Sequence, residues 1–337
     1  MQHVFLGRTG LRVSRTGFGA IPIQRIGFPE AKQLLLRAVE GGINFFDTAL
    51  GYSDSEAKIG EAFEGLDRAS LVIATKTPSK TGEGLLSDLE TSLGRLRMSY
   101  VDLYQFHNPD FLPQPGGEDG LYDAALAMKA AGKIRHIGIT QHDAARAIEA
   151  ARCGLYETVQ YPLSYLSSER DLAVVDACRE NGVGFIAMKG MSGGLLSNAA
   201  AAHAYMRGLD IVVPIWGIEK MSELEDFLRF EAQGVEMNDA LRADIEKDRA
   251  ELTGSFCRGC GYCLPCPVDI PISIAARLSY LMKRSVASNY LTPEWQDRME
   301  NITNCTECGQ CASRCPYDLK PYELLKVQLG LYREHFV

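Results

Sequence analysis

Short apolar runs alternate with amphipathic helical patterns along most of this chain. After a hairpin pattern at residues 4–13, apolar runs predict strands at residues 16–23, 43–47, 71–76, 101–106, 136–139, 158–161, 184–188 and 211–215. Apolar residues at helical spacing predict intervening helices at residues 30–40, 55–64, 83–97, 119–131, 142–151, 168–181, 195–208 and 222–230. Eight strand–helix pairs with short connections predict an α/β fold, a (β/α)8 TIM barrel of parallel strands.

An open doubly wound sheet is the alternative arrangement of these elements. It needs a glycine-rich phosphate loop between the first strand and a helix. Gly17-Phe18-Gly19 is too short for that fingerprint, and no helix follows it directly. The sequence therefore favours the barrel. A barrel takes roughly 250 residues, so we expect it in residues 1–237 and a smaller domain in residues 238–337.

Three consecutive predicted strands end in side chains that suit catalysis. The second strand ends at Asp47 and is followed by a glycine-containing turn that carries Tyr52. The third strand ends at Lys76, and the fourth ends at His107. Because barrel enzymes keep their active sites at the carboxyl ends of the strands, these four side chains are predicted to meet. A phenol beside an ammonium is a proton donor whose pKa the ammonium is expected to lower.

Composition narrows the class of protein. Hydrophobic residues make up 46% of the chain and charged residues 23%, which is typical of a soluble globular protein. A net charge of −8 argues against a nucleic-acid-binding surface. No apolar run approaches the roughly 20 residues that cross a bilayer, and the first residues do not resemble a secretory signal. We therefore expect a cytoplasmic protein with no membrane partner.

Eight of the ten cysteines form two tight runs near the C-terminus. The second run has the ferredoxin spacing C-x₂-C-x₂-C-x₃-C-P, and the first run is one residue shorter before its last cysteine. In such pairs of runs the fourth cysteine ligates the other cluster. This predicts two [4Fe–4S] clusters, one on Cys257, Cys260, Cys263 and Cys315, and one on Cys305, Cys308, Cys311 and Cys266.

Two other interpretations of the cysteine runs stay open. Paired C-x₂-C motifs also build Cys₄ zinc sites, and a single cluster with a purely structural first run is possible. The remaining cysteines, Cys153 and Cys178, are expected to be small core side chains. Helices are predicted at residues 238–252, 271–284, 293–303 and 321–337, so the C-terminal domain should be a small α-helical dicluster ferredoxin-like domain.

Several segments resemble the aldo-keto reductase superfamily. They are Phe5-Leu-Gly-Arg-Thr-Gly-Leu-Arg-Val-Ser14, Phe46-Asp-Thr-Ala49, Ala74-Thr-Lys76 and His107-Asn-Pro-Asp110, and the match runs through residues 1 to about 235. The resemblance implies a catalytic tetrad of Asp47, Tyr52, Lys76 and His107. With the cysteine runs, the chain resembles an iron–sulfur branch of that superfamily. Its C-terminal segment is similar to helical dicluster ferredoxin domains such as those of succinate dehydrogenases.

The resemblance also implies a nicotinamide site. Thr140, Gln141 and Gln160 match positions that hold the carboxamide, and Met188 stands where many members stack a tyrosine on the ring. Ser192-Gly-Gly-Leu195, which includes Gly194, resembles the pyrophosphate loop. Lys220 and Asp226 fall in the adenosine-binding region, where residues 217–226 contain no arginine for a 2′-phosphate and where Glu219 would repel one. NADP and NAD both stay open as cofactors.

Three hypotheses about function follow. The first is NAD(P)H-dependent reduction of a small-molecule carbonyl substrate, with the clusters serving electron transfer, sensing or structure. The second is an electron-transfer protein whose clusters deliver single electrons to a barrel-bound substrate without nicotinamide and exchange them with a protein partner. The third is a binding module with relic catalytic residues.

Overall fold

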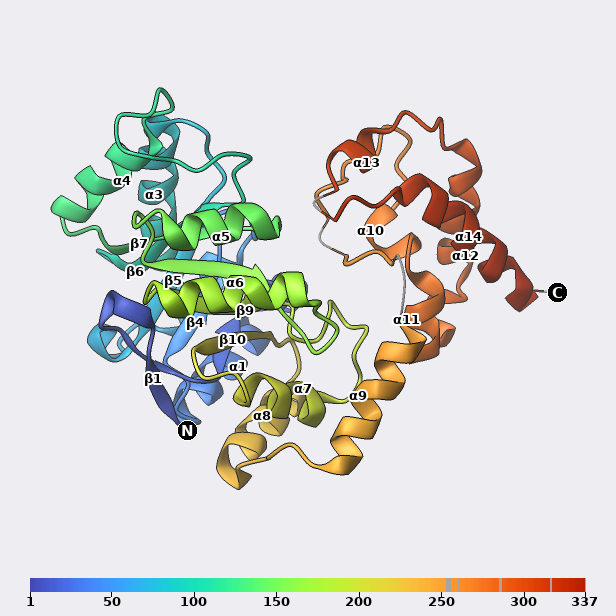
Figure 1. The fold of residues 1–337 in the computed structure, drawn as a ribbon, viewed down its shortest axis with the longest axis horizontal. Helices are drawn as coiled ribbons and strands as arrows, with labels where there is room; N and C mark the ends of the chain where they lie inside the picture. Colours follow the sequence, from blue (N-terminus) through green and yellow to red (C-terminus); the bar gives the residue numbers. More distant parts are fainter. Residues whose placement is uncertain (253–255, 260, 285–286, 316, 337) are drawn as a thin grey trace. The chain divides into compact units, whose positions relative to one another are not determined.

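The computed structural model describes residues 1–252, 256–259, 261–284, 287–315 and 317–336. The chain divides into two compact units (Figure 1). The first unit contains Met1–Gly190 and Ala199–Asn238, and the second contains Met191–Asn198 and Asp239–Val337. The short segment 191–198 therefore leaves the first unit and groups with the C-terminal residues.

The first unit is a closed barrel of parallel strands, as the sequence predicted. Each strand pairs with its two neighbours, and the last strand pairs with the first to close the ring. The strands, in barrel order, are β3 (Gly17–Gly19), β4 (Phe45–Asp47), β5 (Val72–Thr77), β6 (Val101–His107), β7 (Ile134–Thr140), β8 (Thr158–Pro162), β9 (Gly184–Met188) and β10 (Val212–Gly217). The TIM-barrel prediction is confirmed.

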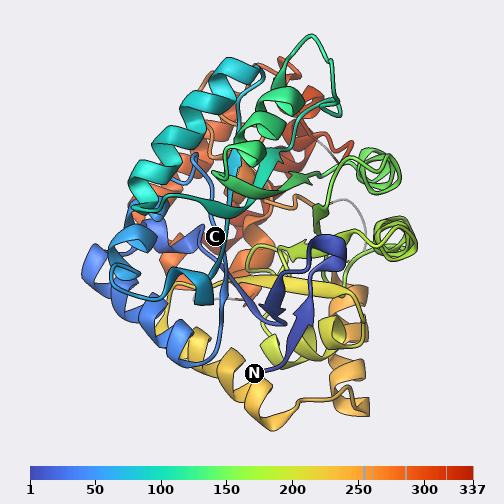
Figure 2. The ribbon, with the colours of Figure 1, turned by 90° about the vertical axis from the view of Figure 1, so that its left-hand side faces the viewer.

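Helices surround the strands on the outside of the barrel (Figure 2). They are α1 (Phe28–Glu40), α2 (Ser55–Ala62), α3 (Gly82–Leu96), α4 (Leu121–Ala130), α5 (Ala144–Arg152), α6 (Glu169–Glu180), α7 (Ala199–Arg207) and α8 (Met221–Gln233). Helix α1 illustrates the cause, because its apolar residues recur at helical spacing and are buried, namely Ala31, Leu34, Leu35 and Ala38. Each helix thus covers the sheet with one apolar face.

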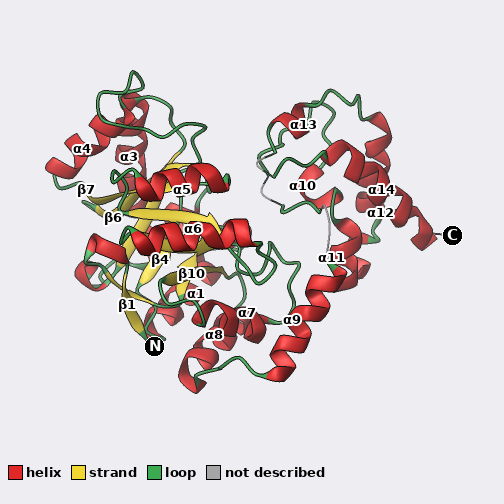
Figure 3. Ribbon diagram, in the orientation of Figure 1, coloured by secondary structure: helices red, strands yellow, loops and turns green. Residues whose placement is uncertain are grey.

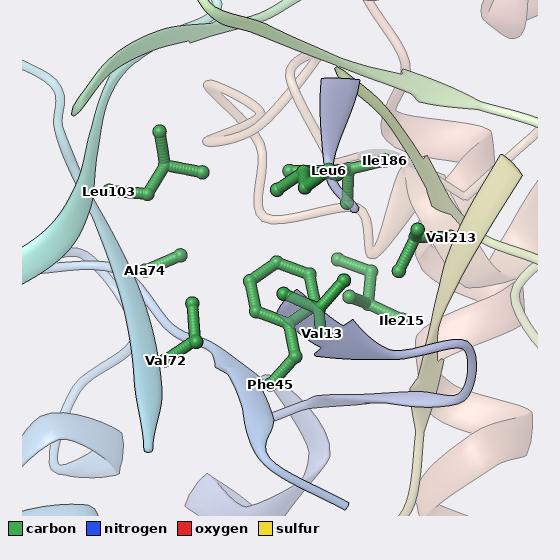
Figure 4. Close-up of a cluster of buried hydrophobic side chains, with 9 residues drawn as sticks. All are labelled: Leu6, Val13, Phe45, Val72, Ala74, Leu103, Ile186, Val213 and Ile215. Carbon is green, nitrogen blue, oxygen red and sulfur yellow. The ribbon is translucent and has the colours of Figure 1, made fainter. Parts of the chain in front are cut away.

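An antiparallel hairpin of β1 (His3–Phe5) and β2 (Arg12–Ser14) packs at the amino ends of the barrel strands. Leu6 and Val13 are fully buried with Phe45 and Val72, which begin β4 and β5 (Figure 4). The turn between the hairpin strands, η1 (Gly7–Thr9), touches the start of β9, where the Arg8 N–H donates to the Gly182 carbonyl at 2.8 Å. The hairpin therefore fills the amino end and leaves chemistry to the carboxyl end.

Two expectations for the first unit are wrong. The strand predicted at residues 16–23 ends at Gly19, and residues Pro22–Arg25 form a 3₁₀ helix, η2. Proline lacks the N–H that a further strand bond would need. Cys153, predicted to be a core side chain, is exposed just after α5, whereas Cys178 is fully buried as expected.

Helices and loops, with no strand, make up the described residues of the second unit (Figure 3). The helices are α9 (Asp239–Glu251), α10 (Ile272–Ala275), α11 (Leu278–Arg284), α12 (Pro293–Glu300), α13 (Gln310–Ser313) and α14 (Pro321–Arg333). The helix predicted at residues 271–284 breaks into α10 and α11, and the four-residue α13 was not predicted. Within the described ranges of the chain, no helix combines the length and the hydropathy that a membrane span requires.

Candidate active site and cysteine centre

A buried ion pair lies at the carboxyl ends of β4 and β5. Asp47 is the last residue of β4, and Lys76 is the last but one of β5. The Lys76 Nζ lies 2.6 Å from the Asp47 Oδ2 and also donates to the Thr48 carbonyl at 2.6 Å. Asp47 is 2% exposed and Lys76 is 1% exposed. Charges buried this deeply are tolerated because they are paired, so each side chain depends on the other for its ionised form.

Two glutamines hold the same carboxylate from the other side. The Gln105 Nε2 on β6 donates to the Asp47 Oδ1 at 3.2 Å, and the Gln160 Nε2 on β8 lies 3.5 Å from the Oδ2. Both glutamine side chains are fully buried inside the barrel. Asp47 therefore accepts from an ammonium and two amides, which fix its orientation.

The aromatic members of the predicted site lie beside this pair. Tyr52 sits in the turn between β4 and α2, and His107 is the last residue of β6. The Lys76 Nζ is 4.9 Å from the centroid of the Tyr52 ring. The Tyr52 and His107 rings meet edge to face, with centroids 5.8 Å apart and planes at 81°. The structure thus brings all four predicted side chains together at one end of the barrel.

Hydrogen bonds fix the turn that carries Tyr52. The Thr48 N–H donates to the Ala74 carbonyl at 2.9 Å, and the Leu50 N–H donates to the Lys76 carbonyl at 3.2 Å. These bonds tie the turn to β5. At the other end of the turn, the Ser55 hydroxyl, at the first residue of α2, donates to the Ala20 carbonyl at 2.9 Å. The turn that carries the phenol is therefore anchored to backbone carbonyls at both of its ends.

Burial sets the protonation of the site. It raises the pKa of Asp47 and lowers that of Lys76, and in each case the partner's charge opposes the shift. Burial, with the Asp47 charge added, raises the pKa of the Tyr52 phenol well above its usual value. The expectation that the pKa of Tyr52 is lowered is therefore wrong, because burial has the largest effect on the phenol. Burial, and then Lys76, lowers the pKa of His107 to about 3, so its ring is neutral at pH 7.

Two of the residues predicted to hold a nicotinamide lie on β7 and β8, the strands that follow β6 in the barrel. Thr140 ends β7 and pairs in register with Gln160 on β8. The Thr140 Oγ1 and the Gln160 Oε1 are buried and have no hydrogen-bond partner among the described residues. Orphaned buried polar atoms of this kind fit a polar ligand such as a carboxamide. Gln141 instead donates to the Pro109 carbonyl at 2.9 Å, and Met188 packs against the barrel core.

The remaining predicted nucleotide residues separate into two places. Ser192, Gly194 and Leu195 belong to the segment that groups with the second unit. Lys220 precedes α8 in the first unit, where its N–H donates to the Glu223 carboxylate at 3.1 Å. Asp226 on α8 accepts from Arg229 at 2.6 Å. Three of these residues thus belong to the second unit and two to the first.

Cysteines line a pocket in the second unit. Cys266 of the first run joins Cys305, Cys308 and Cys311 of the second run, and Cys263 also reaches the wall. Cys266, Cys305, Cys308 and Cys311, in a pocket whose wall is otherwise largely apolar, fit the four ligands of a [4Fe–4S] cluster. Of the other predicted set, Cys257 and Cys263 are buried, Cys315 follows α13, and Cys260 lies outside the described residues. In the part of the chain that is described, no three side chains are grouped to hold a single metal ion.

Comparison with known proteins identifies both parts. A sequence model of the aldo/keto reductase family matches residues 15–229, which is more than half of the chain. The chain belongs to the aldo/keto reductase family. A model of the 4Fe-4S dicluster domain matches residues 256–320 of this aldo/keto reductase. The protein is therefore an oxidoreductase of the aldo-keto reductase type with a C-terminal iron–sulfur domain.

Relatives of this aldo/keto reductase agree with the assignment. The uncharacterized oxidoreductase YrpG of Bacillus subtilis is 31% identical over 234 residues, which cover 59% of this chain and 69% of the relative. The NADH-specific methylglyoxal reductase of Escherichia coli is 29% identical, over 54% of this chain and 65% of its own length. The holo structure of an aldo-keto reductase from Bacillus halodurans has a TM-score of 0.62 at 21% identity and covers 74% of this chain and 96% of its own.

Two side chains near the site were missed in the sequence analysis of this aldo/keto reductase. Gln105 stands two residues before His107, and the alternation of a strand puts both on the same face. That signal could have identified it. Arg25, in the η2 helix after β3, lies 2.6 Å from Glu219 before α8. These two residues are distant in sequence, so no local pattern indicates that they pair.

Proposed function

We propose that this aldo/keto reductase reduces the carbonyl group of a small aldehyde or ketone with NAD(P)H, using Asp47, Tyr52, Lys76 and His107. The observation that carries the proposal is the fully buried Asp47–Lys76 pair against the face of the Tyr52 ring, with the neutral His107 at the ring's edge. No feature of barrel stability requires a buried charge pair and a phenol at the same strand ends. The family membership supplies the reaction class.

Tyr52 is the proton donor in this proposal. NAD(P)H, when bound, supplies hydride to the carbonyl carbon, and the oxygen then needs a proton. Because the raised pKa keeps the phenol protonated at neutral pH, Tyr52 always holds the proton that it gives. The Lys76 ammonium on the ring face stabilises the phenolate that remains, and Asp47 holds that ammonium in place. A positioned general acid of this kind contributes about 10²–10⁴-fold in rate.

His107 orients the carbonyl as a neutral ring. Its pKa of about 3 means that the ring carries no charge at pH 7 and can donate one hydrogen bond to the substrate oxygen. A charged imidazolium beside Lys76 would be repelled, since that ammonium lowers the pKa of His107 further. The site therefore offers two neutral donors, Tyr52 and His107, above one buried charge pair.

The nicotinamide is assigned to the strand ends beyond His107. The unpartnered Thr140 Oγ1 and Gln160 Oε1 offer a hydroxyl and an amide oxygen to the carboxamide. We assign the pyrophosphate to Ser192–Leu195 after β9, since barrels frequently bind phosphate after their seventh and eighth strands. At the adenosine end, Glu219 can accept from a ribose 2′-hydroxyl, and Arg25 can pair with a 2′-phosphate. The Arg25–Glu219 pair therefore permits either nucleotide.

The clusters are assigned as two [4Fe–4S] centres in a domain that we place at residues 238–337 after a barrel at residues 1–237. Cys305, Cys308, Cys311 and Cys266 would hold one cluster, and their shared cavity supports this set. Cys257, Cys260, Cys263 and Cys315 would hold the other. Bound clusters carry single electrons. Their role here would be exchange with a redox partner protein or sensing of the redox state.

Deuteride transfer tests the reductase proposal. The anaerobically purified protein is incubated with 4-deuterated NADPH or NADH and a panel of small aldehydes that includes methylglyoxal, and the alcohol is analysed by mass spectrometry. We expect stereospecific incorporation of one deuterium at the carbonyl carbon. Tyr52→Phe should slow it by about 10²–10⁴-fold, while the nucleotide affinity in a fluorescence titration stays unchanged. Binding of neither nucleotide would refute the nicotinamide part of the proposal.

A second function is favoured by the match to a dicluster domain in the same chain. In it, the clusters would deliver single electrons to a barrel-bound substrate without nicotinamide. The same preparation separates the two functions. Dithionite-reduced clusters that an aldehyde reoxidises in the absence of nucleotide would support electron transfer, whereas clusters that stay reduced beside the aldehyde would support hydride transfer.

A further inference from the structure

The loop after β9 is held by the iron–sulfur half of the chain. Residues 191–198 group with the second unit although both flanking segments belong to the barrel. Ser192, Gly193 and Gly194 all have positive φ, at 48°, 65° and 90°. A non-glycine residue such as Ser192 adopts that conformation only when surrounding contacts impose it. The loop is therefore shaped by the contacts that it makes in the second unit.

Arg277, between α10 and α11, makes such a contact. It is 7% exposed, its NH1 donates to the Ser192 carbonyl at 3.3 Å, and its Nε donates to the Ser273 carbonyl at 3.0 Å. A Cβ on Gly193 would lie 2.9 Å from the NH1, and a Cβ on Gly259 would lie 2.4 Å from the Cζ. The guanidinium thus fills a slot that exists only because both residues are glycine.

The other wall of this slot is the first cysteine run. Gly259 lies between Cys257 and Cys260 in sequence, and its N–H points to the Cys257 Sγ at 3.4 Å. The same Cys257 sulfur lies 3.9 Å from the Ser273 carbonyl that Arg277 binds. One guanidinium therefore touches the peptide that would wrap a cluster and the loop that follows a barrel strand.

We propose that Arg277 is a positioning residue that fixes the Ser192–Leu195 loop for the nucleotide pyrophosphate and so couples nucleotide affinity to the first cysteine run. The inference rests on the proposed nicotinamide function. A planar guanidinium can bond two carbonyls in different directions, as Arg277 does with Ser192 and Ser273. Movement of the peptide at Gly259, for example on a change of cluster state, would reach the loop through this side chain.

Arg277→Met in the cluster-loaded protein removes both hydrogen bonds and keeps the length of the side chain. We expect the dissociation constants of NADH and NADPH in a fluorescence titration to rise about tenfold or more, the effect of losing a charge-assisted hydrogen bond. Hydrogen exchange of the amides at residues 191–198 should become faster. The rate at saturating nucleotide and the absorbance near 400 nm should change little, because neither the tetrad nor a cysteine is altered.

Two further variants make the result specific. Arg277→Lys keeps the charge and should recover part of the affinity. Arg298→Met removes an arginine from α12 of the same unit, where it pairs with Glu294 at 2.7 Å, and should behave as the wild type. If Arg277→Met loses its clusters, the cluster-loaded Arg277→Lys protein decides, and its affinity should lie measurably below that of the wild type.

Two results would overturn the inference in distinguishable ways. Wild-type nucleotide affinity and unchanged exchange at residues 191–198 in the cluster-loaded Arg277 variants would remove the role of Arg277 and leave the proposed reductase function intact. A wild-type protein that binds neither nucleotide would remove the nicotinamide function, and the coupling would fall with it.

Discussion

The Asp47–Lys76 pair offers the sharpest test of the site, because its effects on stability and on catalysis can be separated. Lys76→Met leaves a carboxylate that is 2% exposed with only the two glutamine amides as donors. Breaking a buried pair in this way typically costs 3–5 kcal/mol. Since the amides remain, we expect about 3 kcal/mol for Lys76→Met. Asp47→Asn, which leaves the ammonium with the Thr48 carbonyl, should cost about the same.

The double variant Asp47→Asn with Lys76→Met buries no charge. It should cost only about 1 kcal/mol, in place of the roughly 6 kcal/mol of two independent changes. Carbonyl reduction should nevertheless stay about 10²–10⁴-fold below the wild type in all three variants. Lys76→Met and the double variant remove the ammonium from the Tyr52 ring, and Asp47→Asn removes the carboxylate that holds that ammonium in place. Stability would recover in the double variant and activity would not.

Urea unfolding followed by tryptophan fluorescence measures the stability of the barrel alone. The chain has two tryptophans, so a Trp295→Phe background leaves Trp216, which is 1% exposed in β10 and stacked on Phe227 at 4.4 Å. The cost of Lys76→Met should shrink as the pH falls. Burial raises the pKa of Asp47, and loss of the opposing Lys76 charge raises it further, so the folded variant binds a proton that the unfolded state and the wild type lack.

Two outcomes would refute this reasoning. Recovery of turnover together with stability in the double variant would mean that the pair serves folding and not catalysis. A cost of the double variant equal to the sum of the two single-variant costs would mean that the two charges do not depend on each other in the folded barrel.

Three further predictions test the proton donor, the clusters and the barrel's acid stability. Tyr52→Phe should lower kcat by about 10²–10⁴-fold and leave the nucleotide dissociation constant within about twofold, as single-turnover and titration measurements would show. Cys266→Ala should lower the iron content from about eight to about four atoms per chain, whereas Cys178→Ala should not change it. Burial alone would raise the pKa of Glu231, but bonds from His203 and Thr16 lower it from 4.5 to about 2. This carboxylate, 1% exposed, therefore contributes about 3 kcal/mol at neutral pH that is lost as the pH falls from about 5 to 2. Glu231→Gln should flatten that part of the stability curve, and an unchanged curve would exclude Glu231 as its cause.

The barrel and its four convergent side chains could be predicted because their signals are local. The pattern of a strand, the position where it ends and the type of residue there can all be read from a few consecutive residues. Closure of the ring then brings Asp47, Lys76 and His107 to the same end of the barrel. Errors occurred where a short-range rule overrode the apolar pattern. Pro22 ended the first strand early, and the single turn of α13 is too short to produce a helical period.

The protonation state of Tyr52 could not be predicted for a different reason. The sequence predicts a lysine and an aspartate near the phenol, but it does not show how deeply the phenol is buried or which of the two charges affects its pKa more. In the structure the Lys76 ammonium donates to the Asp47 carboxylate and to the Thr48 carbonyl, and it lies 4.9 Å from the centroid of the Tyr52 ring. Burial then dominates and the pKa of the phenol rises. A proton donor that stays protonated until the oxygen becomes basic suits reduction better than one that is half ionised at rest.

Contacts between residues that are distant in sequence could not be predicted either. Arg25 meets Glu219 across 194 residues, and Arg277 meets Ser192 across 85. No pattern within a strand or a helix encodes such a pair, since each member is an ordinary charged or polar residue in its own segment. The four convergent side chains thus follow from local strand ends, whereas the contacts to which we assign roles in nucleotide binding join residues that are far apart in sequence.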